Sequence, residues 1–351
     1  MLEAWNPSVA RASIETDWAC VDRSFVELRK RAGSKIENLQ TFCLERVYLR
    51  DQVPVLRGNL VGYYEDCLAT CDAIERELLL AFASNPPNTA DVVEFDRFAK
   101  ANLALRNAAK AFCVERSASP YLTGIGRSAA IAVSTLLFAK MPDRSVVTFL
   151  GQRSGKTAAH PYLMHVVPSG MFQPIWHWQN PGRSMDSQYY STEWSLRNHV
   201  LRELAHELFG RDIHSDLARQ PPETPDVIFG YPEVKYLDHL ITSGKANLFV
   251  TAVLVNLLNL RPEIATVLII DDPKWYDQHS RGTHGLPRFA RSWEFLNDVK
   301  LVVWTPTQGD RSQDLRSQLG GVTSRNFVVP GAITFLLGLR FARTSHWTLK
   351  P

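Results

Sequence analysis

The residues best suited to chemistry lie in one segment, Arg197 to Gly210, with the sequence RNHVLRELAHELFG. On a helical wheel of about 100° per residue, its valine and leucines share one arc, which we expect to pack on a sheet. The opposite arc collects Arg202, Glu203, His206 and Glu207. Two carboxylates four residues apart on one helix face can hold a hard divalent cation together with waters and a substrate phosphate.

An ordinary solvated helix face is the alternative for this arc. Glutamate, histidine and arginine at these spacings also occur on exposed helices, where they form weak side-chain pairs. If His206 acts as a third ligand, its imidazole favours transition metals such as Mn²⁺ over Mg²⁺. Gly210 is expected to end the helix in a left-handed conformation.

The same segment resembles the Nudix superfamily, whose signature is G-x5-E-x7-R-E-U-x-E-E-x-G-U, where U is aliphatic. Residues 202 to 207 (RELAHE) match the R-E-U-x-E-E portion, except that His206 replaces the first glutamate of the final pair. The stretches 150–158 and 165–170 are similar to the family's preceding strand, turn and P-x-G. The runs at 248–270 and 293–306 are similar to its later strands and closing acidic turn. The resemblance covers roughly residues 145 to 345.

The resemblance implies roles for several residues. Glu203 and Glu207, with His206 completing the shell, would bind Mg²⁺ or Mn²⁺. Glu207 or a bound water would assist attack on a diphosphate, and Arg202 would orient the glutamates. The implied activity is a pyrophosphohydrolase acting on a nucleoside diphosphate derivative. The chain departs from the family at His206 and in the insertion 171–192, which leaves Glu193 one residue too far from Arg202.

Two further functions therefore stay open. One is a catalytically inactive Nudix-like domain that binds a nucleotide-type ligand as a sensor or regulator. The other is a protein-interaction scaffold, which would use the aromatic insertion as its contact surface. The loss of the third glutamate favours inactivity, whereas the survival of Glu203 and Glu207 favours the enzyme.

Four more residues are candidate ligand contacts. Arg153 and Lys156 lie in GQRSGKT, whose glycines are too closely spaced for a P-loop, so we expect a polar hairpin that contacts an anionic ligand. Trp176 and Trp178 lie in the insertion and could stack on a nucleobase. Packing of the insertion onto the body, or a partner surface, is the alternative. The polar loop 271–292 is a candidate lid, and its two aspartates are a candidate helix or turn cap.

Composition and patterning bound the class of protein. The 351 residues are 45% hydrophobic and 21% charged, as in globular proteins, and the net charge of +3 is too small to suggest nucleic acid as a partner. No apolar stretch is long enough to span a bilayer, and no secretory signal is visible, so we expect a cytoplasmic protein without a membrane partner. The five cysteines are expected to be structural thiols.

The chain is expected to form two domains. Residues 1–140 are predicted to be a helical N-terminal domain, with helices over 60–82 and 98–112, that serves packing or homodimer formation. Residues 141–351 are predicted to be a Nudix-like α/β sandwich of mixed sheet and helices. Its predicted strands are 146–150, 162–167, 248–255, 265–270 and 299–304, and its predicted helices are 197–209 and 332–342.

Overall fold

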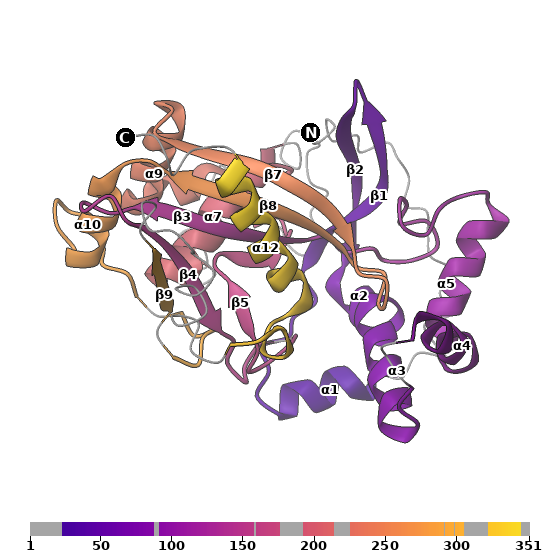
Figure 1. The fold of residues 1–351 in the computed structure, drawn as a ribbon. Helices are drawn as coiled ribbons and strands as arrows, with labels where there is room; N and C mark the ends of the chain where they lie inside the picture. The colour runs from indigo at the N-terminus through magenta and orange to yellow at the C-terminus, as the bar shows by residue number, and fades with distance from the viewer. Residues whose placement is uncertain are drawn as a thin grey trace.

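The centre of the protein is a mixed, seven-stranded β-sheet. In the computed structural model, the described residues are 23–87, 91–157, 159–175, 192–213, 225–290, 292–297, 299–304 and 322–344. The main strand order is β5-β4-β3-β8-β7, with β6 paired to β3 and β9 paired to β4 (Figure 1). β3 and β8 run parallel, and the other pairs are antiparallel. The strands are β3 (Ala132–Lys140), β4 (Val146–Gln152), β5 (Met164–Val166), β6 (Ser169–Met171), β7 (Ala246–Val255), β8 (Pro262–Ile270) and β9 (Lys300–Trp304).

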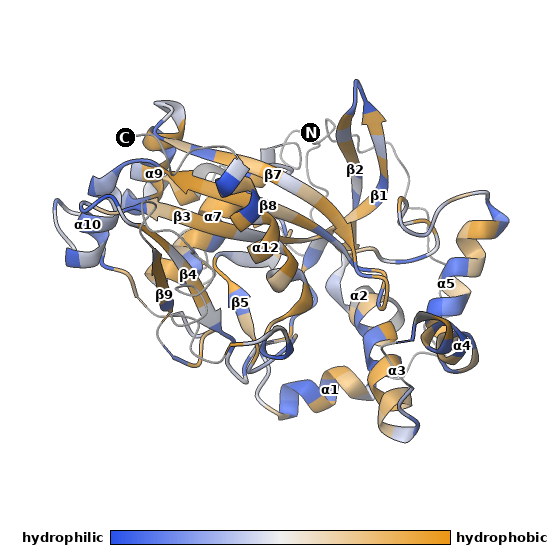
Figure 2. Ribbon diagram, viewed as in Figure 1, coloured by the Kyte–Doolittle hydropathy of each residue, from blue (hydrophilic) through white to orange (hydrophobic). Residues whose placement is uncertain are grey.

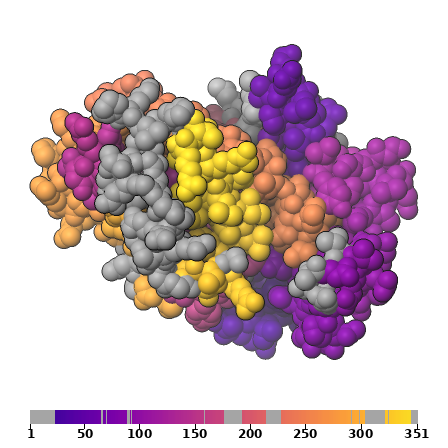
Figure 3. Space-filling view, viewed as in Figure 1, coloured from indigo at the N-terminus to yellow at the C-terminus, as the bar shows by residue number. Residues whose placement is uncertain are grey.

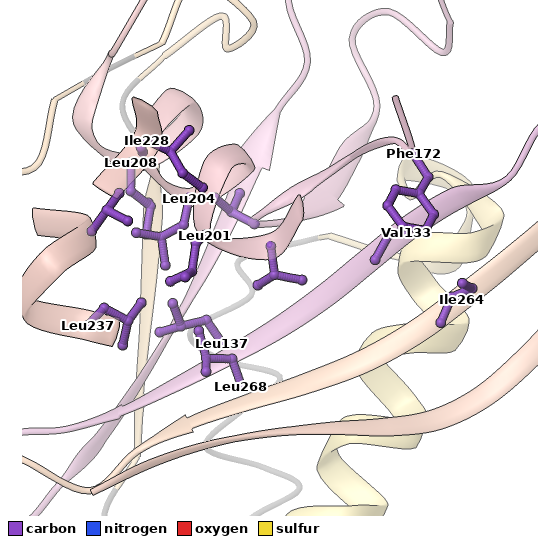
Figure 4. Close-up of a cluster of buried hydrophobic side chains, with 14 of the residues drawn as sticks. Val133, Leu137, Phe172, Leu201, Leu204, Leu208, Ile228, Leu237, Ile264 and Leu268 are labelled. Atoms are coloured by element: carbon purple, nitrogen blue, oxygen red, sulfur yellow. The ribbon is translucent and has the colours of Figure 1, made fainter. Parts of the chain in front are cut away.

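Helices cover both faces of this sheet. One face packs against α7 (Leu196–Phe209), α9 (Pro232–Thr242) and α10 (Pro273–Arg281), and the other against α12 (Val329–Thr344). Successive side chains of β3 point to opposite faces of the sheet. Leu137 belongs to the hydrophobic core beneath α7, and Leu136 belongs to the core beneath α12. Figure 4 shows the α7 leucines pointing at Leu137 and Leu268, and Figure 3 shows α12, in yellow, lying across the opposite face. The predicted α/β sandwich is confirmed.

The predicted strands and helices of the sandwich are present within a few residues of their expected bounds. Two short 3₁₀ helices, Pro225–Gly230 and Ser324–Asn326, precede α9 and α12. The predicted lid at 271–292 is wrong, because this stretch contains α10, whose Trp275 is fully buried in the core. Asp272 caps that helix by accepting a hydrogen bond from the backbone N–H of Lys274 at 2.9 Å, which confirms the predicted cap.

The region before the sandwich is mainly helical but contains a β-hairpin. Its helices are α1 (Ser24–Arg31), α2 (Tyr63–Ala69), α3 (Cys71–Ser84), α4 (Val92–Asn102) and α5 (Ala104–Glu115). Figure 2 shows helices α3 to α5 carrying both apolar and polar residues. The helices predicted over 60–82 and 98–112 are each divided in two, at Thr70 and at Leu103, and residues 60–62 belong to β2. The expectation of helix throughout misses the hairpin of β1 (Gln40–Arg50) and β2 (Val53–Gly62). Its two-residue turn places Asp51 and Gln52 at positive φ, which matches the twist of paired strands.

The hairpin and the sandwich share one hydrophobic core. Phe42 and Leu44 of β1 belong to the same buried cluster as the α7 leucines. The backbone N–H of Phe42 donates to the Phe172 carbonyl at 2.8 Å, and the Ile131 N–H donates to the Phe42 carbonyl at 2.9 Å. The central strand β3 also ends at Lys140, just before the predicted boundary at 141. The division into two domains stays a prediction. The central sheet already begins with β3, within the range 1–140 that was predicted to be helical.

The remaining sequence expectations concern thiols and membranes. Cys43, Cys67, Cys71 and Cys113 are buried and form no disulfide with one another, in agreement with the predicted structural thiols, and Cys20 lies outside the described residues. None of the helices in the described part of the chain combines the length and apolar character that a membrane crossing requires.

Candidate active site

The helix α7 turns its polar arc toward a cavity, because both of its ends are capped and its apolar arc packs on the sheet. Ser195 caps the start by accepting a hydrogen bond from the Asn198 N–H at 3.3 Å, and Gly210 ends the helix with φ of 64°, as predicted. Leu204 is fully buried against the sheet. Arg202 and Glu207 are also buried, so the alternative of a solvated helix face is wrong.

Glu207 is the most deeply buried acid of the arc. Its side chain has no exposed surface, and its Oε2 accepts a hydrogen bond from the backbone N–H of Ser169 at 2.9 Å. Its other oxygen, Oε1, is buried and accepts no hydrogen bond from any described residue. Burial, reinforced by the charges of Glu294 and Glu203, raises the pKa of Glu207 well above its ordinary value. This oxygen is available to a proton or to a cation.

Glu203 lies against the short strand β6. A Cβ at Gly170 would stand 2.7 Å from Glu203 Oε2, so only glycine leaves room for this carboxylate at its observed place. Burial raises the pKa of Glu203, and the neighbouring Arg202 opposes that shift. The two glutamates are therefore brought to one site, as the helical spacing predicted.

His206 is engaged at both ring nitrogens. Its Nδ1 lies 2.8 Å from the Arg211 carbonyl oxygen, and its Nε2 lies 3.6 Å from Glu294 Oε1. Burial disfavours the charged ring, but the Glu294 carboxylate outweighs this effect and raises the pKa of His206 to about 9. A protonated imidazolium has no lone pair for a metal, so in this arrangement His206 acts as a partner of Glu294. Its predicted role as a metal ligand stays a prediction.

Arg202 ties α7 to the segments on either side of the insertion. Its guanidinium contacts Glu193 Oε2 at 3.3 Å and Glu203 Oε1 at 3.4 Å, and it donates to the Gln173 carbonyl at 2.6 Å. Glu193 thus reaches Arg202 in space although it is one residue out of register with the family signature. These contacts suit the predicted orienting role of Arg202.

Glu203 and Glu294 line a cavity of about 530 Å³, and the fully buried Glu207 lies beside them. Arg153 lines the cavity, as predicted for an anion contact, whereas Lys156 is exposed and does not line it. The segment of both residues forms the predicted polar turn between the antiparallel strands β4 and β5. Trp176 and Trp178 lie outside the described residues. Sequence reasoning did not single out several further lining residues: Lys35, His160, His165, Arg261 and Glu263.

A divalent cation is a partial fit to this site. In the described ranges, no three His, Cys, Asp or Glu side chains converge as a ready-made metal shell. The ligands still suit a hard cation, because Glu203 and Glu207 are carboxylates and none of the described residues donates a hydrogen bond to Glu207 Oε1. A cation held by these two groups would need waters or ligand oxygens to complete its coordination.

Gly170→Ala tests whether the Glu203 carboxylate must stay where it is. The added methyl group would displace the end of a flexible side chain, so we expect a small change in stability and a loss of at least about tenfold in any cation-dependent activity. Thermal melts and rate measurements on the purified variant check this. Gly230→Ala, where a Cβ meets nothing within 4 Å, is the matched control. Full activity in Gly170→Ala would contradict the assigned position of Glu203.

The comparisons with known proteins give weak likenesses. No family model matches the chain, and no curated protein matches it. Among solved structures, the Nudix hydrolase RenU from M. smegmatis is 13% identical, with a TM-score of 0.26 over 62% of this chain and 87% of that one. A NUDIX hydrolase from Alicyclobacillus acidocaldarius is 12% identical, with a TM-score of 0.27 over 61% and 95%. Scores this low carry no conclusion about fold or function.

Proposed function

We propose that this chain is a Nudix-like protein that binds a nucleoside diphosphate derivative and hydrolyses its phosphoanhydride bond with the help of Mg²⁺ or Mn²⁺. The observation that carries the proposal is that Glu203, Glu294 and Arg153 line one cavity, with the buried Glu207 close enough to feel the charges of all three. Burial and the neighbouring carboxylates raise the pKa of both Glu203 and Glu207, and buried acids with a raised pKa are typical of catalytic sites.

Within this proposal, each side chain has a distinct task. Glu203 and Glu207 would hold the cation, which supplies neutralisation of phosphate charge and acidifies a bound water. Glu207 Oε1, buried and without a donor, accepts a proton at the attacking water, and its raised pKa suits a base that works near neutral pH. Arg202 holds Glu203 in place, and Arg153 binds the phosphate oxygens.

The test is hydrolysis of a panel of nucleoside diphosphate derivatives with Mg²⁺, with Mn²⁺ or with a chelator. We expect a product that requires the cation and that falls by at least about a hundredfold in Glu203→Gln. Glu115→Gln, an exposed change on α5, is the control and should leave the rate unchanged. Turnover that persists in chelator, or in Glu203→Gln, would contradict the proposal.

An inactive ligand sensor is the second candidate, and one observation favours it. His206 stands where the family signature has a glutamate, and it pairs with Glu294 instead of adding a carboxylate. A protein of this kind would show a ligand that raises the melting temperature without being consumed. The same nucleotide panel separates the two, because product analysis distinguishes turnover from binding. A cytoplasmic location and a homodimer stay predictions.

A further inference from the structure

The cavity reaches both faces of the sheet. On one side it is lined by Arg202, Glu203 and His206 of α7, and on the other by Val328 and Pro330 at the start of α12. The strand pair β3 and β6, whose residues also line the cavity, spans only three residues. The α12 side carries no group assigned above, although it contains a buried acid.

That acid is Glu263 on β8, whose side chain is 4% exposed and lines the cavity. Ser134 on the adjacent strand β3 donates a hydrogen bond to its Oε1, and no other described residue donates to it. The nearby arginines are committed elsewhere, since Arg261 pairs with Asp72 at 2.6 Å and Arg153 Nε donates to the Ala159 carbonyl. Burial raises the pKa of Glu263 to about 7, so the carboxylate ionises near and above neutral pH. An ionised carboxylate offers about four acceptor sites, so in this form Glu263 keeps most of its accepting capacity for something inside the cavity.

The strand register sets the distance between the two ends. Glu263 pairs with Ala132, and Ala132 pairs in turn with Met171, which is next to Gly170 and the Glu203 carboxylate. Two strand spacings of about 4.8 Å place Glu263 roughly 10 Å across the sheet from the phosphate end. This is the span from the edge of a purine to the first phosphates of its nucleotide. One end of the cavity therefore suits phosphates, and the other suits a base.

We infer that Glu263 is the residue that selects the base, and that it favours a nucleotide whose base presents two adjacent N–H donors, as guanine does. The inference rests on the proposed function, because it assigns the other end of the same ligand. Both carboxylate oxygens of Glu263 would accept from the guanine ring N–H and its exocyclic amino group. Hypoxanthine lacks that amino group, and adenine presents an acceptor where guanine has the ring N–H.

The experiment is a calorimetric comparison of guanosine, inosine and adenosine diphosphates binding to the full chain with Mg²⁺. We expect guanosine diphosphate to bind at least about tenfold more tightly than inosine diphosphate, which differs only by the amino group. In Glu263→Gln this preference should shrink to less than about twofold. Glu37→Gln changes another glutamate that lines the cavity, is the matched control, and should keep the preference.

The outcomes separate this inference from the proposed function. Equal binding of guanosine and inosine diphosphates to the unaltered protein overturns the role of Glu263 and leaves nucleotide binding standing. A guanine preference that survives Glu263→Gln does the same. If none of the three nucleotides binds, the inference is overturned, and the hydrolysis panel described above decides the proposed function separately. The comparison of guanosine and inosine diphosphates uses only the unaltered protein. It can therefore overturn the role of Glu263 even if Glu263→Gln fails to fold.

Discussion

Replacement of Glu207 by glutamine is expected to lower the cation-dependent hydrolysis rate by about two to four orders of magnitude. The amide cannot take a proton and is a poorer ligand for a hard cation than a carboxylate. Folding should be preserved, because the side chain keeps its shape and its carbonyl can still accept from Ser169 N–H. Initial rates at saturating nucleotide, together with thermal melts, provide the measurement.

The melts carry a second expectation with a definite sign. The folded-state pKa of Glu207 is raised, so folding without a cation is penalised in full above that pKa. The penalty shrinks as the pH falls below the raised pKa, and it is gone below the ordinary pKa of glutamate. In chelator at pH 8, Glu207→Gln should therefore melt at or above the temperature of the unaltered protein. Glu115→Gln, with a side chain 71% exposed, is the control for both readouts. A variant that keeps more than half of the rate would remove Glu207 from the mechanism.

Truncation of Leu204 to alanine is expected to destabilise the fold by about 3 kcal/mol, within the range of about 2 to 5 kcal/mol for buried leucines. Leu204 has no exposed surface, and it lies between α7 and the sheet (Figure 4). The cavity left behind cannot be filled cheaply, because β3 and β8 on the other side are held in a sheet.

Urea denaturation of the variant measures this loss. Leu79→Ala is the matched control, since Leu79 is on α3 with 61% of its surface exposed and should cost less than about 0.5 kcal/mol. Equal effects of the two truncations would mean that α7 does not rely on this contact. A small loss of stability with a large loss of hydrolysis would instead indicate that Leu204 mainly sets the position of the glutamates.

The features that sequence predicts best are local ones. The leucine spacing of α7, its glycine cap and the shared face of Glu203 and Glu207 all follow from helix geometry within fourteen residues. The hairpin is harder, because Phe42, Cys43 and Leu44 are all buried, so β1 lacks the alternation that identifies a half-exposed strand. The central strand β3 is buried on both faces and shows only a continuous apolar run.

The site shows the same division between local and distant information. Glu263 is a single acid in an apolar strand, and only the pairing of β8 with β3 reveals that it shares a cavity with Ser134. The charge of His206 depends on Glu294, which lies beyond α9, β7, β8 and α10 in the chain. Contacts of this kind join residues that are far apart in the chain, so they cannot be predicted from the spacing of residues along one helix.

The parallel pairing of β3 with β8 also constrains how the chain assembles. The partner threonines Thr135 and Thr266 are separated by 131 positions, so the middle of the sheet can close only after most of the polypeptide has left the ribosome. Until β8 is synthesised, the apolar residues of β3 lack their native partner strand and can associate with other chains. Slow maturation and a need for chaperone protection during synthesis follow from this topology.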